Sequence, residues 1–297
     1  MMNRFFLVMA ICVIYLPNNA QSVGRLQKLR YSLDSLISAQ EGIFALSFRN
    51  LSGTEKLDIN EGVVFHAAST MKTAVLAEIF KQAGQGKIKL SDSLELNSEF
   101  KSIVDGSPYR LDSADDSETS LYRHLGEKRT ISQLMYLMIT ASSNFATNLL
   151  IDKVDARKVT QSLQKMGIHD MKVLRGVEDG KAFQQGLNNV ITSADLAILF
   201  EKLGRKKLVS ARASQAMIDI LQDQQFNEMI PARLPKGVKV AHKTGWIKGI
   251  NHDSGLVFLP DGRKYVLVLL SKTSMDDQRS KEVLALISEM VYHYMVP

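Results

Sequence analysis

Apolar and polar residues follow strand spacing near both ends of the chain and helical spacing between them. The first clear helical pattern covers residues 22–39, with apolar residues at Val23, Leu26, Leu29, Leu33, Leu36 and Ile37. Two strand-like runs then follow at residues 43–50 and 55–60, on either side of Leu51, Ser52 and Gly53. This is the pattern of a β-hairpin, and residues 63–65 add a short extended piece.

The middle of the chain is predicted to be helical. Candidate helices, separated by polar segments, cover residues 69–83, 131–139, 145–153, 157–166, 192–203 and 209–222. The last part returns to strands at residues 238–245, 254–259 and 264–271, and a closing helix covers residues 276–293. Asp261 and Gly262 supply the turn between the last two strands.

This order of elements predicts an α/β (α+β) fold. One antiparallel sheet would draw strands from both termini and be flanked by the first and last helices, with an all-helical lobe inserted. The expected α/β lobe comprises residues 21–68 and 225–297, and the helical lobe comprises residues 69–224. A cleft between two such lobes is where we expect a functional site.

The first residues resemble an export signal. Arg4 precedes an uncharged apolar run that ends at Pro17, which predicts a signal peptide over residues 1–20 and a catalytic domain over 21–297. The run is too short to cross a bilayer core of roughly 30 Å, so no stable membrane anchor is expected. Cys12 is the one cysteine and lies in this segment, so the mature protein would have no thiol. We therefore expect a periplasmic or secreted protein.

Charge and residue types exclude several functions. The formal net charge is +6, and the basic residues are scattered along the chain, which argues against a nucleic-acid site. The six histidines are also scattered, and only His252 with Asp253, expected at a strand end, resembles a metal-ligand pair. No GxSxG motif of an α/β-hydrolase occurs. We expect no metal, no organic cofactor and a monomer.

A serine and a lysine three residues apart supply the first candidate chemistry. SxxK occurs three times, but only Ser69 and Lys72 stand at the start of a strongly apolar helix, directly after an extended piece. Residues three apart share a helix face, so the Lys72 amine can reach the Ser69 hydroxyl. Lowering a lysine pKa from about 10.4 to about 7 requires roughly 4 to 5 kcal/mol of desolvation and repulsion, and a second cation nearby would help.

Two further motifs occur once each. Lys243, Thr244 and Gly245 end an apolar strand, and Ser142 and Asn144 form an SxN triplet between two predicted helices. Taken singly, each also has an ordinary structural interpretation. A lysine and a glycine are common at the end of a strand, and serine and asparagine commonly cap helices.

SxxK, SxN and KTG in this order match the motif set of penicillin-recognising serine enzymes. The chain resembles a class A β-lactamase over nearly the whole mature sequence. The resemblance implies that Ser69 is the acylated nucleophile, that Lys72 exchanges its proton and that Ser142 passes a proton to the leaving nitrogen. Backbone N–H groups of Ser69 and Trp246 would form the oxyanion hole.

The resemblance also implies binding roles for the other motif residues. Asn144 would hold the amide side chain of the substrate, and Lys243 and Thr244, followed by Gly245, would bind its carboxylate. Asn148 matches an asparagine with which the family braces its second active-site loop. The implied substrate is a small molecule, either a β-lactam or a peptidoglycan-like compound.

The chain departs from the family pattern in the loop that should align the hydrolytic water. Counting back from Leu187 and Asn188 places Gln184 at the position of the family's glutamate, and an amide cannot take a proton from water. Counting forward from Arg175 gives Glu178 instead, with Asp179 beside it. Both registrations stay open at this point, and the two carboxylates could also simply tie the loop to Arg175.

Two other residues are unusual for the family. Ser143 stands where the family usually has an aspartate, which should affect loop support more than chemistry. Trp246 is bulky for the position after KTG, and its indole would reshape the rim of the pocket.

The sequence favours a serine β-lactamase, an antibiotic-resistance hydrolase that forms an acyl-enzyme on Ser69, with Glu178 as the deacylating base. The rival enzyme is a D,D-peptidase or a related peptidoglycan hydrolase with the same motifs. Two further alternatives are a penicillin-binding protein that is acylated without turnover and a serine hydrolase of this fold that acts on other esters or amides.

Overall fold

The computed structural model describes residues 18–296. The predicted signal peptide over residues 1–20 therefore lies outside the described residues, apart from its last three, and so does Cys12. The described part begins with helix α1 (Asn18–Ser38), which confirms the helix predicted over residues 22–39.

A five-stranded antiparallel sheet joins the two ends of the chain. Its strands are β1 (Ile43–Asn50), β2 (Lys56–Ile59), β9 (Lys239–Ile247), β10 (Ile250–Phe258) and β11 (Lys264–Lys272). Their order is β2-β1-β11-β10-β9, and β1 pairs antiparallel with β11. The predicted sheet built from both termini is thus confirmed. Gly262 closes the β10–β11 turn at φ +87°, a conformation that suits glycine.

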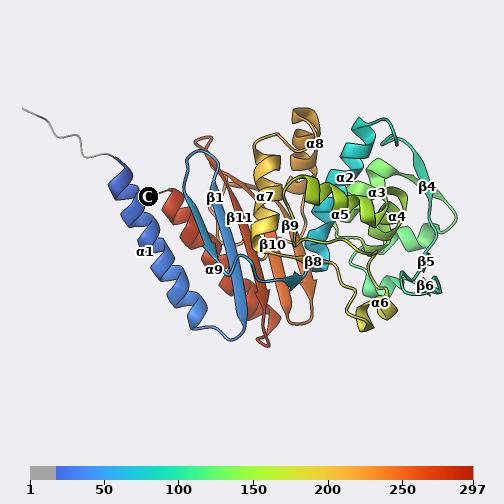
Figure 1. Ribbon diagram of the computed structural model, residues 1–297, viewed down its shortest axis with the longest axis horizontal. Coiled ribbons are helices and arrows are strands. Elements are labelled where there is room, and N and C mark those ends of the chain that lie inside the picture. Colours follow the sequence, from blue (N-terminus) through green and yellow to red (C-terminus); the bar gives the residue numbers. More distant parts are fainter. Residues whose placement is uncertain (1–17, 297) are drawn as a thin grey trace, which may run out of the picture.

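The two faces of the sheet are buried against different helices (Figure 1). Because successive strand residues point to opposite sides, Phe44, Leu46 and Phe48 pack on one face with residues of α1 and α9 (Asp277–Met295). Ala45 and its cross-strand neighbours lie on the other face, in the core shared with the central helices. The first and last helices therefore flank the sheet, as the sequence predicts, and the central helices cover its other face.

Six of the central helices were predicted from periodicity, and the structure confirms them. They are α2 (Lys72–Gly84), α3 (Ile131–Thr140), α4 (Asn144–Val154), α5 (Ala156–Lys165), α7 (Ser193–Gly204) and α8 (Ala211–Gln222). Side-chain oxygens of Thr130, Ser143, Thr192 and Ser210 accept backbone N–H groups at the starts of α3, α4, α7 and α8. These N-caps satisfy donors that a helix cannot pair internally.

Helix α2 is the centre of the helical region. Residues 72–80 are buried without interruption, so this helix is enclosed on all sides. A 3-10 helix, η1 (Ala68–Met71), precedes it, so the predicted helix over 69–83 consists of two joined elements.

Several short elements were not predicted. They are the 3-10 helices η2 (Ser113–Asp115) and η3 (Ser120–His124), helix α6 (Gly180–Gln184), and the strands β4 (Ser93–Glu95), β5 (Glu99–Lys101), β6 (Pro108–Arg110), β7 (Lys128–Thr130) and β8 (Val190–Ile191). The extended piece expected at residues 63–65 is β3 (Phe65–His66), and it pairs with β8 outside the main sheet. This small ladder joins the segment before η1 to the end of the loop at residues 175–189.

Helix α7 packs on β1 and β11, although it belongs to the segment assigned to the helical lobe. The lobe boundaries therefore stay a prediction. Among residues 18–296, no helix is long and apolar enough to cross a membrane.

Candidate active site

Ser69 lies in η1, between strand β3 and helix α2. It is half-buried, and the preceding Ala68 has a left-handed φ of +45°. Strand β9 packs against η1 with Gly245, where an added Cβ would stand 3.0 Å from the Ser69 nitrogen and 3.1 Å from the Ala68 Cβ. A glycine at this point thus lets the KTG strand come close to the backbone of Ser69.

Lys72 has no exposed surface, and its Nζ contacts the SxN turn. The Nζ donates to the Ser142 carbonyl oxygen at 2.7 Å and to Asn144 Oδ1 at 2.9 Å, and it lies 3.2 Å from Ser142 Oγ. Burial lowers the pKa of Lys72 to about 7, although the carboxylates of Asp116 and Glu178 act in the opposite direction. Near neutral pH, a large fraction of this amine is unprotonated.

The spacing of SxxK led us to expect that the Lys72 amine reaches the Ser69 hydroxyl. Within residues 18–296, the hydrogen bonds of Lys72 Nζ go to Ser142 and Asn144, and none goes to Ser69. The carbonyl of Ser142 and the amide oxygen of Asn144 only accept, so a neutral amine uses both of its protons on them. Its lone pair is then free for the Ser142 hydroxyl, and Nζ must exchange a partner before it can accept a proton from Ser69.

Ser142 Oγ is shared by two buried lysines. Lys243 Nζ donates to this hydroxyl oxygen at 3.0 Å and to the Thr244 carbonyl at 3.0 Å. Burial, and the nearby charge of Lys72, hold the pKa of Lys243 well below its ordinary value. Ser142 itself has a left-handed φ of +57°, which is strained for a residue with a side chain. The three sequence motifs thus meet at one hydroxyl group.

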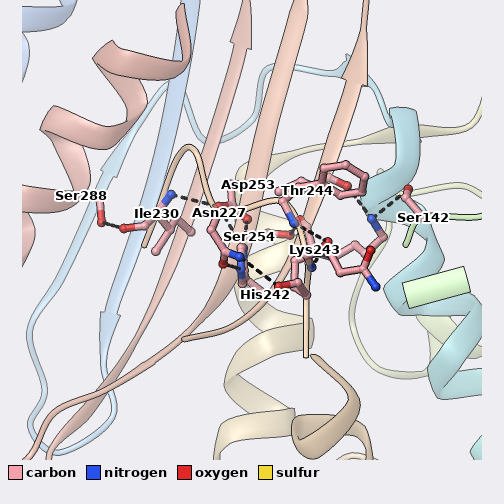
Figure 2. A network of polar contacts seen from close by, with 12 residues as sticks. Ser142, Asn227, Ile230, His242, Lys243, Thr244, Asp253, Ser254 and Ser288 are labelled. Atoms are coloured by element: carbon pink, nitrogen blue, oxygen red, sulfur yellow. Dashed lines mark hydrogen bonds and ion pairs between the residues drawn. The ribbon is translucent and has the colours of Figure 1, made fainter. Parts of the chain in front are cut away.

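A polar network centred on the buried His242 and Asp253 lies next to Lys243 (Figure 2). Asp253 Oδ1 lies 2.8 Å from His242 Nδ1, and Asp253 Oδ2 accepts the Ile230 backbone N–H at 3.0 Å. The other ring nitrogen of His242 lies 3.2 Å from Asn227 Oδ1. These contacts tie the segment around Asn227 and Ile230 to the strand that carries the KTG motif.

The expectation that His252 and Asp253 lie at a strand end was wrong, because both lie inside β10 and are fully buried. Adjacent strand residues point to opposite faces, so the two side chains serve different contacts. His252 Nε2 donates to the His66 carbonyl, while Asp253 faces His242. No cluster of three or more metal-ligating side chains occurs in the part of the chain that the structure describes.

Glu178 is the loop carboxylate that the structure brings to Ser69. It lines the same two cavities as Ser69, and its Oε1 lies 3.5 Å from the Asn144 amide nitrogen, which donates to it. Partial desolvation, followed by the neighbouring Asp115 carboxylate, raises the pKa of Glu178. Its φ of +61° is left-handed, so strained backbone occurs at Ala68, Ser142 and Glu178 around one site.

The other two loop candidates lie elsewhere. Gln184 is exposed at the end of α6 and lines neither cavity. Asp179 is buried, and it accepts hydrogen bonds from Ser102 Oγ and the Ile103 and Ala182 backbone N–H groups at 2.9, 2.9 and 3.1 Å. Asp179 therefore caps α6 and holds the loop to residues 102–103, without an ion pair to Arg175.

Arg175 and Asn189 close the neck of this loop. Asn189 Oδ1 accepts the Leu174 and Arg175 backbone N–H groups, and Asn189 Nδ2 donates to the Arg175 carbonyl at 3.0 Å. The Arg175 guanidinium donates to the Leu187 carbonyl at 2.9 Å. Asn148 braces the loop from α4, because it accepts the Val177 N–H at 2.6 Å and donates to the Val177 carbonyl at 3.0 Å.

Two adjoining cavities meet at Ser69. One of about 400 Å³ extends under the loop and includes Phe183 and His66, and one of about 780 Å³ extends toward Met229 and Lys281. Both cavities are lined by Ser69, Asn144, Glu178, Trp246 and Ile247. A substrate held across this junction would contact groups on both sides of the serine.

Trp246 and Thr244 belong to the same wall. The Trp246 side chain is 56 % exposed at the rim, and its indole N–H donates to Asp277 Oδ2 at 2.9 Å. Thr244 is buried and lines the larger cavity. The indole is thus fixed at the position where the sequence predicts a reshaped rim.

Reasoning from sequence missed the segment 115–117, which contacts the SxN turn. Asp116 accepts the Asn144 and Phe145 backbone N–H groups, and Ser117 Oγ donates to the Ala141 carbonyl. These residues lie in a polar stretch without periodicity, so no sequence pattern distinguishes them from an ordinary solvated loop.

The sheet, the inserted helices and the convergence of SxxK, SxN and KTG on one cleft define the class of penicillin-recognising serine enzymes. The chain belongs to the beta-lactamase enzyme family, whose sequence model matches residues 28–295.

The relatives cover nearly the full length of the chain. It is 25% identical to a beta-lactamase of Bacteroides uniformis over 91% of this chain and 92% of the relative. It is 24% identical to the extended-spectrum beta-lactamase PER-1 of Pseudomonas aeruginosa, over 90% and 87%. Among solved structures, PBP-A has a TM-score of 0.80 and 30% identity, over 91% of this chain and 97% of PBP-A. A single-site mutant of PBP-A has been solved as an acyl-enzyme complex with penicillin G.

Proposed function

We propose that this chain is a serine β-lactamase that hydrolyses the β-lactam amide through an acyl-enzyme on Ser69. The observation that carries this proposal is the meeting of two fully buried lysines, Lys72 and Lys243, at Ser142 Oγ in the cleft that holds Ser69. Membership of the beta-lactamase enzyme family supports it.

Acylation begins when Lys72 Nζ exchanges its contact with Ser142 Oγ for one with the Ser69 hydroxyl. Ser69 Oγ then attacks the amide carbonyl carbon, and its proton moves to Lys72. With a pKa of about 7, the Lys72 amine is available as a base at neutral pH. The C–N bond then breaks, Ser142 gives its proton to the leaving nitrogen, and Lys72 returns a proton to Ser142. The distance of 3.2 Å between Lys72 Nζ and Ser142 Oγ makes this relay direct.

The backbone N–H groups of Ser69 and Trp246 stabilise the negative charge that develops on the carbonyl oxygen by donating hydrogen bonds to it. Losing one such donor typically costs about 3 to 4 kcal/mol of transition-state stabilisation. The close approach of Gly245 to the Ser69 nitrogen keeps the two backbone segments together. Lys243 and Thr244 receive the substrate carboxylate, and Asn144 receives the amide side chain.

Deacylation uses a water molecule aligned by Glu178. The water oxygen bonds to the acyl carbon, Glu178 takes the water proton, and the bond from that carbon to Ser69 Oγ breaks as the proton returns to the serine. The position of Glu178 supports this role for it rather than for Gln184, because Glu178 lines both cavities beside Ser69 and Gln184 lines neither.

The site would work without metal or organic cofactor, in a monomer located in the periplasm or outside the cell. The export-like pattern at residues 1–20 supports this location.

A second candidate function is that of a penicillin-binding protein or D,D-peptidase that is acylated with little turnover. It is favoured by the 30% identity to PBP-A over nearly its full length. It is also favoured by the unusual loop, in which Glu178 reaches the cleft from a left-handed backbone conformation.

The test combines a chromogenic cephalosporin, to follow turnover, with a fluorescent penicillin, to detect an adduct by intact mass. Continuous hydrolysis that is lost in Ser69→Ala supports the β-lactamase. A persistent adduct on Ser69 without turnover supports the second candidate. Hydrolysis that persists in Ser69→Ala would refute both.

A further inference from the structure

The SxN turn needs support that its own residues do not supply. Ser142 has a left-handed backbone, and its neighbour Ser143 is fully buried. The Ser143 hydroxyl accepts the Ala146 N–H at 3.1 Å, and the Ser143 carbonyl accepts the Thr147 N–H at 3.2 Å. Both contacts lie within the start of α4, and the Ser143 N–H donates to the Leu137 carbonyl of α3 at 3.1 Å. Ser143 therefore joins the turn to the two helices beside it, and does not bind it to a segment outside α3 and α4.

Three consecutive residues of another loop make that connection. The Asp115 carbonyl accepts the Asn144 side-chain N–H at 3.4 Å, and Ser117 Oγ donates to the Ala141 carbonyl at 2.7 Å. Between them, the Asp116 carboxylate accepts the Asn144 backbone N–H at 2.9 Å and the Phe145 N–H at 2.8 Å. The segment 115–117 thus holds the SxN turn at both ends.

The Asp116 carboxylate is buried, and all its hydrogen-bonding capacity is used. Its Oδ1 also accepts the Glu118 N–H at 3.1 Å, and its Oδ2 accepts the Tyr122 hydroxyl at 2.9 Å, so each oxygen receives two donors. Two of the four donors are the first N–H groups of α4, where the helix dipole favours a negative charge. Four charge-assisted bonds fix this carboxylate, and with it the turn, in one arrangement.

We propose that Asp116 is a positioning residue for acylation, whose carboxylate fixes the backbone of Asn144 and thereby the places of the Ser142 hydroxyl and the Lys72 amine. The chain of contacts is short. Asp116 holds the Asn144 backbone, the Asn144 side chain accepts from Lys72 Nζ at 2.9 Å, and the Ser142 carbonyl next to it accepts from the same Nζ at 2.7 Å. The inference rests on the acylation proposed above.

Asp116 also acts on Lys72 through its charge. The charged groups that face Lys72 are Asp116 from this loop, Glu178 from the loop at residues 175–189 and Lys243 from β9. Asp116 raises the pKa of Lys72 against the effect of burial. Removing its charge should therefore lower the pKa of Lys72, which a purely structural defect would not do.

The experiment measures the second-order rate constant for acylation by a fluorescent penicillin between pH 5.5 and 9 in the wild type and in Asp116→Asn. We expect the rate in D116N to fall roughly tenfold or more at pH 8, because an amide cannot accept all four donors. We also expect the acid limb of the pH–rate profile, where the acylation rate rises with pH, to move to lower pH in D116N. The difference in rate between D116N and the wild type should therefore become smaller toward pH 5.5. A rate within twofold of wild type, or a lower rate with an unmoved acid limb, would overturn the proposal.

A second variant tests whether a carboxylate placed elsewhere beside the SxN turn restores the acylation rate. In the double variant D116N/S143D, the carboxylate introduced at position 143 can still cap α4 and places its charge beside the same turn, so acylation should recover at least several-fold over D116N. No recovery in a folded double variant counts against a positioning role for the carboxylate.

A variant that leaves the Asp116 side chain unchanged tests the proposal if D116N does not fold. Ser117→Ala removes the 2.7 Å contact to the Ala141 carbonyl and leaves the charge of Asp116 in place. We expect a several-fold lower acylation rate with an acid limb at the wild-type pH. An unchanged acylation rate would overturn the proposal that the segment 115–117 positions the SxN turn. If the wild type itself forms no adduct with the penicillin, the proposed function is wrong, and this inference fails with it. If the wild type is acylated and the variants behave as the wild type does, only this inference fails.

Discussion

The low pKa of Lys72 should be measurable as a pH-dependent stability. Its pKa is about 7 in the fold, against an ordinary value of 10.5, and the side chain is fully buried. At about 1.36 kcal/mol per pKa unit, the charged form costs the fold roughly 5 kcal/mol. Below pH 7, Lys72 is protonated in both the folded and the unfolded state, so the whole cost is present there.

Between pH 7 and 10.5, the unfolded chain binds more protons at this residue than the folded one does. Stability therefore rises with pH across this window, and the cost disappears near pH 10.5. In Lys72→Met, this dependence is absent. We expect the free energy of unfolding of the wild type, relative to that of K72M, to increase by about 2.5 kcal/mol from pH 7.5 to pH 9.5. This increase corresponds to roughly 5 to 10 °C in Tm.

The assay is urea denaturation of both proteins at several pH values, with the difference between them as the readout. Lys101 provides a matched control, because it also ends an SxxK sequence but is exposed. K101M should show no such pH-dependent difference from wild type below pH 9. If the wild-type and K72M curves run parallel, Lys72 stays charged in the fold, and the amine cannot serve as the base for Ser69.

Three further outcomes are expected at the site. Glu178→Gln should accumulate the acyl-enzyme in intact mass spectra and hydrolyse a chromogenic cephalosporin at least a hundredfold more slowly than the wild type. Gln184→Ala should hydrolyse it at a rate within about twofold of wild type. The reverse pattern would show that Gln184, and not Glu178, acts on the hydrolytic water. Ser142→Gly should melt at a higher temperature than Ser142→Ala by the equivalent of about 1 kcal/mol, because glycine relieves the left-handed φ of +57°, while both lose activity; equal melting temperatures would contradict this. Gly245→Ala should slow acylation about tenfold or more, since its Cβ would stand 3.0 Å from the Ser69 nitrogen, and an unchanged rate would show that the backbone yields there.

The sequence alone predicted the layout of the fold. Strand spacing at both ends and helical spacing between them identified β1, β2, β9, β10, β11 and the longer helices within a few residues. These elements are long enough for their periodicity to be visible, and each is stabilised by one buried face or by complete burial. Two-residue strands such as β3 and β8 show no period, because they exist only where tertiary contacts bring them together.

The sequence also identified the motifs that meet in the cleft. Ser69 stood out from the other two SxxK serines because an apolar helix follows it, and Ser142 and Lys243 followed from the order of the motifs. A motif records residues that lie close in the chain, so its chemistry can be predicted locally. The sequence could not show that Lys72 Nζ is bonded to Ser142 and Asn144, since those acceptors lie about seventy residues away.

Only the tertiary structure decided which loop residues face the site. Counting left the Glu178 and Gln184 registrations both open, and in the structure Glu178, not Gln184, lines the two cavities beside Ser69. Asp116 could not be found in the sequence at all, because a carboxylate in a polar loop looks solvated until its donors are known. Loop side chains take their environment from distant segments, and no local spacing encodes that environment.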